Sequence, residues 1–260
     1  NNLRVYYDFN ETDGSTAADS SGNGFDATIN SMGGGDWDTE GKVGGCLYFD
    51  NTQVDSDLAV FDTVDGNEIS FSMWANIDVE NMGQYNCVVF TTSYSGQLLL
   101  PQNMANDDVS AYFRIGREGG SNESSTLYSY DDVNDPNLSG WHHYAFTKNA
   151  ATGVQRIYRD GILVAENTDR FISLDFLRDE ATDFQIGYYT HGTYTGKLDE
   201  FRVYDYELSQ AEVAHLAGKT SVDQPLTDQE QLVDMVDDNS IDFLDYAVIA
   251  DSWLAEDLWP

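Results

Sequence analysis

Apolar and polar residues alternate along much of the chain, in short runs that are separated by clusters of turn-forming residues. The clearest run covers residues 69–77, and weaker ones cover 3–9, 111–115 and 142–146. A period of two places successive side chains on opposite faces of a strand, so each run predicts a half-buried β-strand. Many short strands with turns between them predict an all-β protein, with two antiparallel sheets packed through their apolar faces.

The segment 196–216 combines a strand pattern with a helix pattern. Phe201 and Val203 share one face of the expected strand, and strict alternation places Asp199 on the same inward face. An ionised carboxylate facing an apolar interior costs several kcal/mol unless a cation, a basic side chain or backbone N–H groups pair with it. A bound Ca²⁺ is one way to satisfy Asp199.

A short helix should follow that strand. Ser209 with Glu212 three residues later forms a capping-box pattern, and Leu208 and Val213 can pack around it as a hydrophobic staple. Gly218 can supply the left-handed residue that ends the helix. A two-residue hairpin turn is expected earlier in the chain, at Asp160 and the glycine that follows it.

The closing segment resembles that of the LamG-like jelly rolls, in the concanavalin A-like lectin/glucanase superfamily, where a final strand with an Asp-Glu pair leads into a short helix. Further stretches follow in the order of the family's landmarks: LRVYYDFNETDGSTAADSSGNGFDATI, GKVGGCLYFD, ISFSMWANI, WHHYAFTK and IYRDGILVAE. The resemblance covers residues 3–217. It implies an antiparallel two-sheet jelly-roll sandwich over residues 1–219, with a short helix after the last strand.

The loop 10–23 is rich in aspartate, serine, glycine and asparagine, whose oxygen atoms suit a hard cation such as Ca²⁺. The same residues dominate ordinary solvated turns, so composition alone leaves both interpretations open. The resemblance implies a structural Ca²⁺ that joins the two ends of the domain. Its ligands would be the side chains of Asp19 and Asp199, with Asn23 as a carbonyl donor.

A proline and several polar residues at 220–225 predict a linker, and residues 226–260 form a separate tail with helical apolar spacing. The tail resembles a single dockerin type I calcium repeat, although Val236 and Asn239 depart from the usual loop. Alternatively, the tail is a two-helix cap that packs on the sandwich. The resemblance implies that the calcium ligands of the loop are Asp234, Asp238, Ser240 through its carbonyl, Asp242 and Asp245.

The 260-residue chain carries 46 acidic and 12 basic residues, for a net charge of −34. Such a surface repels nucleic acid and anionic membranes, and no apolar run is long enough for insertion into a membrane. A saline or Ca²⁺-rich setting fits it, so we expect a secreted or cell-surface protein, although an acidic surface can serve solubility alone. Cys46 and Cys87 could be bridged or could be two buried thiols.

A search for catalytic patterns gives no candidate. Residues 76–80, Asn-Ile-Asp-Val-Glu, lack the first acid of the glucanase motif that they approach, so we expect no catalytic residues. Sugar binding needs aromatic faces beside hydrogen-bonding groups. Tyr188, Tyr189, His191 and Tyr194 form the densest such group, and residues 128–132 form a second, but both could be edge packing.

These patterns predict a non-catalytic, extracellular, calcium-stabilised binding domain whose partner is a glycan or a protein. One alternative is a structural subunit of an extracellular scaffold or filament, which would assemble through the tail with a cohesin-like partner or with copies of itself. Another is an accessory module of a polysaccharide-degrading enzyme.

Overall fold

The structure is a computed structural model. It describes residues 2–31, 37–64, 67–81, 85–91, 96–104, 108–116, 123–129, 138–179, 181–188 and 192–219. The expected linker and the dockerin-like tail lie outside these ranges.

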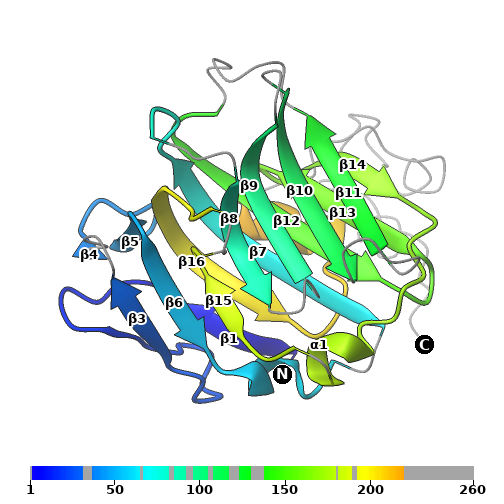
Figure 1. Ribbon diagram of the computed structural model, residues 1–260, viewed down its shortest axis with the longest axis horizontal. Helices are drawn as coiled ribbons and strands as arrows, with labels where there is room; N and C mark the ends of the chain where they lie inside the picture. The colour runs from blue at the N-terminus through cyan, green and yellow to red at the C-terminus, as the bar shows by residue number, and fades with distance from the viewer. Residues whose placement is uncertain are drawn as a thin grey trace, which may run out of the picture.

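Two antiparallel sheets of eight strands each stack face to face, which confirms the predicted sandwich (Figure 1). Sheet A comprises β1 (Leu3–Tyr7), β4 (Trp37–Asp38), β5 (Cys46–Phe49), β7 (Glu68–Ile77), β12 (Trp141–Asn149), β13 (Val154–Arg159), β14 (Ile162–Asn167) and β16 (Gly196–Tyr204). Sheet B comprises β2 (Thr16–Ala17), β3 (Ala27–Ser31), β6 (Thr52–Ser56), β8 (Tyr85–Thr91), β9 (Gly96–Met104), β10 (Asp108–Gly116), β11 (Glu123–Ser129) and β15 (Phe184–Ile186). Three short helices complete the described chain: η1 (Leu58–Phe61), α1 (Asp175–Asp179) and α2 (Gln210–Leu216).

The strand order places the two ends of the domain side by side. Sheet A runs β14-β13-β12-β7-β16-β5-β4, and β1 also pairs with β16. Sheet B runs β11-β10-β9-β8-β15-β6-β3-β2. The last strand of the sandwich therefore lies inside sheet A, with the first strand beside it.

One apolar core fills the space between the sheets. Phe146 of sheet A meets Phe113 of sheet B with ring centroids 5.6 Å apart, and Phe201 of sheet A meets Phe184 of sheet B at 6.4 Å. All four rings are almost completely buried. Aromatic residues at alternate positions thus form the contact that holds the two sheets together.

A β-bulge in β16 changes which face Asp199 occupies. The register shifts between Asp199, which pairs with Trp74, and Arg202, which pairs with Ser72, and Glu200 adopts a positive φ of 56°. Leu198 and Phe201 both point into the core, so the bulge adds one residue between them. The prediction that Asp199 points inward is therefore wrong, because it lies on the outer face of sheet A.

Helix α2 covers another part of the outer face of sheet A. Val213 and Leu208 pack there against Tyr158 and Tyr204. The predicted capping box is confirmed, since the Ser209 side chain accepts from the Glu212 N–H and Glu212 accepts from the Ser209 N–H. Gly218 follows the helix at φ 73°, as expected.

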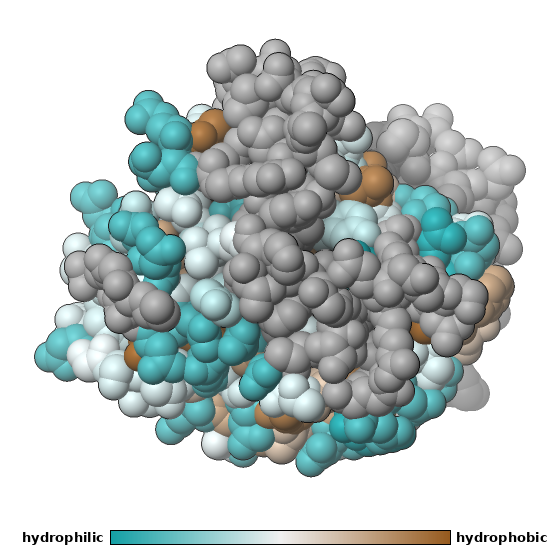
Figure 2. Space-filling model, in the orientation of Figure 1, coloured by the Kyte–Doolittle hydropathy of each residue, from teal (hydrophilic) through white to brown (hydrophobic). Residues whose placement is uncertain are grey.

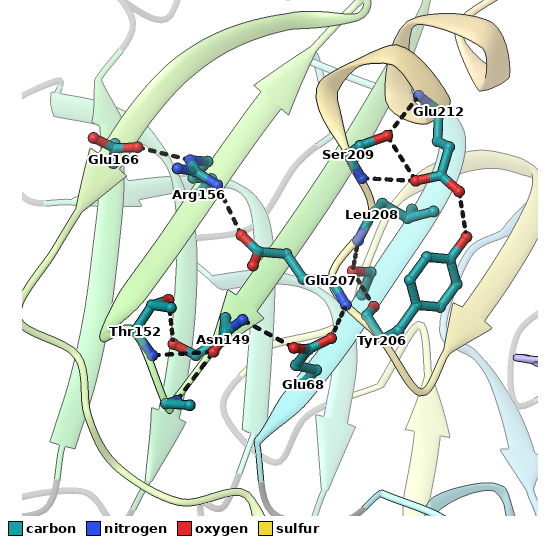
Figure 3. Close-up of polar contacts among 12 residues, drawn as sticks. Glu68, Asn149, Thr152, Arg156, Glu166, Tyr206, Glu207, Leu208, Ser209 and Glu212 are labelled. Atoms are coloured by element: carbon teal, nitrogen blue, oxygen red, sulfur yellow. Dashed lines mark hydrogen bonds and ion pairs between the residues drawn. The ribbon is translucent and has the colours of Figure 1, made fainter.

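Polar contacts fix the segment before α2 to the sheet, as Figure 3 shows. Arg156 bridges Glu166 and Glu207 at 2.7 Å each, and the Glu207 N–H donates to Glu68 at 3.0 Å. The Leu208 N–H donates to the Ser70 hydroxyl at 2.9 Å. These bonds satisfy backbone groups that the end of β16 would otherwise leave unpaired at a buried face.

The two cysteines are free and buried, one in each sheet. Burial raises the pKa of the Cys46 thiol to about 12 and raises that of Cys87 further, so both stay protonated. The hairpin turn between β13 and β14 is also confirmed, with Asp160 at φ 52° and the glycine after it at φ 81°.

Candidate functional site

Asp199 is a buried carboxylate with an incomplete set of partners. The residue is 0% exposed, and its Oδ2 accepts a hydrogen bond from the Val43 N–H at 2.8 Å. Among the described residues, Oδ1 is buried and has no hydrogen-bond partner. Burial, with help from the nearby Glu200 charge, raises the pKa of the Asp199 carboxyl to about 6, although backbone N–H groups of Val43, Lys42 and Glu200 oppose the rise. This is the kind of oxygen atom that a cation stabilises.

The loop 41–45, Gly-Lys-Val-Gly-Gly, covers Asp199. It turns tightly, because the Gly41 N–H donates to the Gly44 carbonyl at 3.0 Å. A Cβ on Gly41 would lie 1.9 Å from the Gly45 carbonyl oxygen, so only glycine fits there. The Asn10 side chain accepts from the Gly45 N–H at 2.6 Å, and Lys42 Nζ lies 4.2 Å from the centre of the Trp74 ring. The three glycines signal the turn, but only the fold shows that it covers Asp199.

Glu200 differs from Asp199, because both of its carboxylate oxygen atoms have a partner. The Tyr6 hydroxyl donates to Oε1 at 2.6 Å, and Arg202 pairs with Oε2 at 2.5 Å. Arg202 also lies 3.9 Å from the centre of the Tyr6 ring. Glu200 thus joins β1 to β16, and its two oxygen atoms are engaged within the protein.

Asp19 differs from Asp199, because β1 and the chain around Asp19 supply a full set of donors. Oδ1 accepts from the N–H groups of Tyr6 and Ser21 at 3.0 and 2.9 Å. Oδ2 accepts from the Phe25 N–H at 3.0 Å and the Ser21 hydroxyl at 2.8 Å. Partial burial opposes ionisation, but these hydrogen bonds outweigh it and leave the pKa of the Asp19 carboxyl lowered. Four donors fill the acceptor positions of one carboxylate.

Asn23 also fixes the loop to β1. Its side-chain amide donates to the carbonyls of Leu3 and Arg4 at 2.8 and 2.9 Å. Asp19 forms an isolated bridge with Tyr7, on the opposite side of β1 from β16.

The fit to one shared ion is partial. Asp199 can give an oxygen atom to Ca²⁺, whereas Asp19 could do so only by releasing N–H or O–H donors. Within the described ranges, the structure gathers no group of three or more His, Cys, Asp or Glu side chains that could hold a metal ion. Backbone carbonyls would have to complete a site at Asp199. Calcium binding by Asp19, Asn23 and Asp199 stays a prediction.

Of the expected ligand-binding residues, the structure describes Tyr188 and Tyr194. Tyr194 is 0% exposed, its ring packs 5.7 Å from Phe49, and its hydroxyl donates to the Lys197 carbonyl at 3.1 Å. It belongs to the core, which corrects its assignment as a sugar contact. Tyr188 is half-buried.

The other predicted site residues lie outside the described ranges. They are Tyr189, His191, Asp234, Asp238, Ser240, Asp242, Asp245 and most of the second aromatic group, residues 130–132.

A polar group on sheet B was not expected from the sequence. The outer side chain of Asp55 on β6 accepts from the amides of Asn30 at 2.5 Å and Gln185 at 3.3 Å, and from Gln53. Figure 2 shows a mostly hydrophilic surface over β3 and β6. These side chains lie on three adjacent strands that are distant in sequence, so the chain order alone does not reveal the group.

Comparisons with known proteins identify the family. The family model described as concanavalin A-like lectin/glucanases superfamily matches residues 50–214, which is more than half of the chain. The chain belongs to this family. No curated protein matches the chain.

Solved structures share this fold at low sequence identity. Domain 4 of an extracellular arabinanase from Geobacillus stearothermophilus, solved with arabinotriose, is 21% identical with a TM-score of 0.59, covering 83% of this chain and 98% of that one. The binding domain of botulinum neurotoxin serotype G is 16% identical with a TM-score of 0.60, covering 84% and 51%. The chain thus spans about half of that toxin domain, and identities this low establish the fold alone. In the described part of this chain, no helix is long and apolar enough to cross a bilayer.

Proposed function

We propose that this chain is a non-catalytic carbohydrate-binding domain of an extracellular protein. The observation that carries the proposal is the likeness to the arabinanase domain, which was solved with arabinotriose and is matched over 98% of its length. A botulinum neurotoxin binding domain solved in complex with SialylT shares the fold with a TM-score of 0.56. The net charge of −34 supports an extracellular setting.

The surroundings of Asp78 support the non-catalytic part of this proposal. Asp78 belongs to the stretch that approaches the glucanase motif. It accepts from the backbone N–H of Asn81 at 3.2 Å and from its side-chain amide at 2.9 Å. Asp78 thus stabilises a turn, which is an ordinary structural role.

A structural Ca²⁺ at Asp199 is part of the same proposal. The unpaired, buried Oδ1 supports it, because a cation there would offset the loss of hydration around the carboxylate. Asp199 Oδ1 would give one ligand to the ion, while Oδ2 already ties the loop 41–45 to β16 through the Val43 N–H.

A glycan array tests the binding function. The protein would be applied with Ca²⁺ and, in parallel, with a chelator, and its folding would be checked by circular dichroism. Binding to one glycan class that weakens in chelator supports both parts of the proposal. Folded, calcium-loaded protein that binds no glycan would overturn the carbohydrate-binding function.

The arabinanase likeness also favours a more specific role, as an accessory module of a polysaccharide-degrading enzyme. Such a module should be retained on insoluble polysaccharide without releasing sugars. Release of soluble sugars by the purified chain would overturn the non-catalytic proposal.

The tail supports a second candidate, an assembly subunit. Its support is the dockerin-like pattern at 234–245. Deleting residues 223–260 should abolish assembly or binding to a cohesin-like partner and leave glycan binding intact. An unchanged sedimentation profile and unchanged partner binding would exclude assembly through the tail.

A further inference from the structure

Four side chains form one row across the outer face of sheet A. The strand register pairs Trp141 on β12 with Asn76 on β7, Asn76 with Lys197 on β16, and Lys197 with Tyr48 on β5. Their strand neighbours Ala75, Leu198 and Leu47 point into the core, so the row itself faces outward. Three strand spacings of about 4.8 Å separate the backbones of the two end residues by about 14 Å.

The row keeps hydrogen-bonding groups available. Trp141, Asn76 and Tyr48 are half-buried, and in the described part of the chain their side chains form no hydrogen bond. Their polar side-chain atoms are not buried, so water can reach them. A ligand hydroxyl could replace that water without breaking a contact within the protein.

The Asp55 group on sheet B shows the opposite arrangement. Three amides already donate to the Asp55 carboxylate, so a ligand there would have to compete with existing hydrogen bonds. It also includes no aromatic side chain, and sugar rings need one for stacking. The comparison favours the row on sheet A as the binding surface.

Charge narrows the class of ligand. Lys197 forms an ion pair with Asp38 at 2.8 Å, and this hydrogen bond raises the pKa of Lys197, which therefore stays cationic. The other three members of the row are uncharged. The row is therefore close to neutral on a chain with a net charge of −34. A polyanion would be repelled by the chain, and the row offers no excess charge to attract either sign.

We infer that the row of Trp141, Asn76, Lys197 and Tyr48 is the glycan-binding surface, and that it takes a neutral oligosaccharide lying across the strands. The two aromatic residues stack on sugar rings, while Asn76 and the Tyr48 hydroxyl bond to ring hydroxyls between them. This inference rests on the proposed carbohydrate-binding function and adds the site and the class of ligand.

Calorimetric titration of the full chain with neutral trisaccharides, arabinotriose among them, tests the inference. Trp141→Ala and Tyr48→Ala should each weaken the best ligand by about tenfold or more, because each removes a stacking ring. Tyr48→Phe should weaken it by a smaller factor, through loss of the hydroxyl alone. Phe171→Ala is the matched control, since Phe171 is 62% exposed and lies outside the row.

The possible results separate the two proposals. Wild-type protein that binds a neutral trisaccharide with unchanged affinity in both alanine variants would refute the row and leave the carbohydrate-binding function standing. Binding only to acidic oligosaccharides would refute the neutral class. No binding to any glycan would remove the proposed function itself. If an alanine variant fails to fold, hydroxyl-radical footprinting of the wild type decides, with protection of Trp141 and Tyr48 expected upon binding.

Discussion

Asp19 and Asp199 are two carboxylates of one domain that meet opposite conditions. Asp19 accepts four hydrogen bonds, from Tyr6 of β1 and from Ser21 and Phe25, whereas among the described residues Asp199 has one oxygen atom bonded and one buried without a partner. The pKa of Asp19 is lowered, and that of Asp199 is raised to about 6. The difference teaches that an aspartate in a calcium-like sequence context can organise a loop through its hydrogen bonds alone, whereas a more deeply buried aspartate with fewer donors keeps a raised pKa.

The largest expected effect is the loss of Asp19. Asp19→Ala would leave three backbone N–H groups without their acceptor and remove the bond from the Ser21 hydroxyl, so it should lower the free energy of unfolding by about 3–4 kcal/mol. Urea denaturation followed by tryptophan fluorescence measures this. Asp13→Ala, an exposed position in the same loop, should leave the midpoint unchanged. Equal effects of the two substitutions would contradict the loop-organising role.

The two carboxylates should also respond to pH in opposite directions. The folded-state pKa of Asp199, about 6, lies above its unfolded value of about 3.9. The folded protein therefore binds more protons between these values, and the Asp199 contribution lowers stability by about 3 kcal/mol in total as pH rises from 3 to 7. Asp19 has a lowered pKa, so its contribution is present above pH 4 and is lost as pH falls further.

Urea denaturation in a chelator, at pH values between 4 and 7, isolates the Asp199 contribution. Asp199→Asn should gain stability relative to the wild type as pH rises, since it has no proton to lose. A constant difference between the two proteins across this range would show that the Asp199 carboxyl titrates normally.

Calcium should act through Asp199. Calcium at a concentration of one hundred times its dissociation constant adds about 2.7 kcal/mol to the free energy of unfolding. This corresponds to a rise of a few degrees in melting temperature. Asp199→Asn should abolish this rise. Asp19→Asn decides between a shared site and a separate one, because loss of the calcium response in that variant would support the joint site implied by the family resemblance. A wild type with no calcium response would exclude both.

The smallest expected effect comes from one donor to Asp19. Ser21→Ala removes the hydroxyl that donates to Oδ2 at 2.8 Å, so it should cost about 1 kcal/mol of stability. Ser15→Ala is the control, as Ser15 is exposed and its side chain forms no hydrogen bond within the described residues. A loss no larger than that of the control would show that the loop does not depend on the Ser21 hydroxyl, which also accepts from the Asn23 N–H at 3.2 Å.

Local patterns in the sequence predicted much of the fold. Alternation located the strands, and Ser209 with Glu212 predicted the cap of α2, because these features depend only on near neighbours. The β-bulge at Glu200 broke the count that placed Asp199 inward, since nothing beside it in the sequence marks an extra residue. Tyr194 was misassigned for a related reason: whether a tyrosine is buried depends on Phe49, which is distant in sequence.

Local sequence patterns could not predict the candidate binding surface. Its four residues come from four strands between positions 48 and 197, and only the register brings them into one row. Each looks ordinary in its own segment, where it is simply the polar or outward member of an alternating pair.

The position of β16 has a consequence for how the protein folds. This strand comes late in the sequence, yet it lies between β7 and β5 and also pairs with β1, where Leu3 is the register partner of Tyr204. During synthesis, sheet A must stay open along its middle until residue 204 has left the ribosome. We therefore expect slow, late closure, with an exposed gap that a chaperone or a neighbouring nascent chain can occupy first.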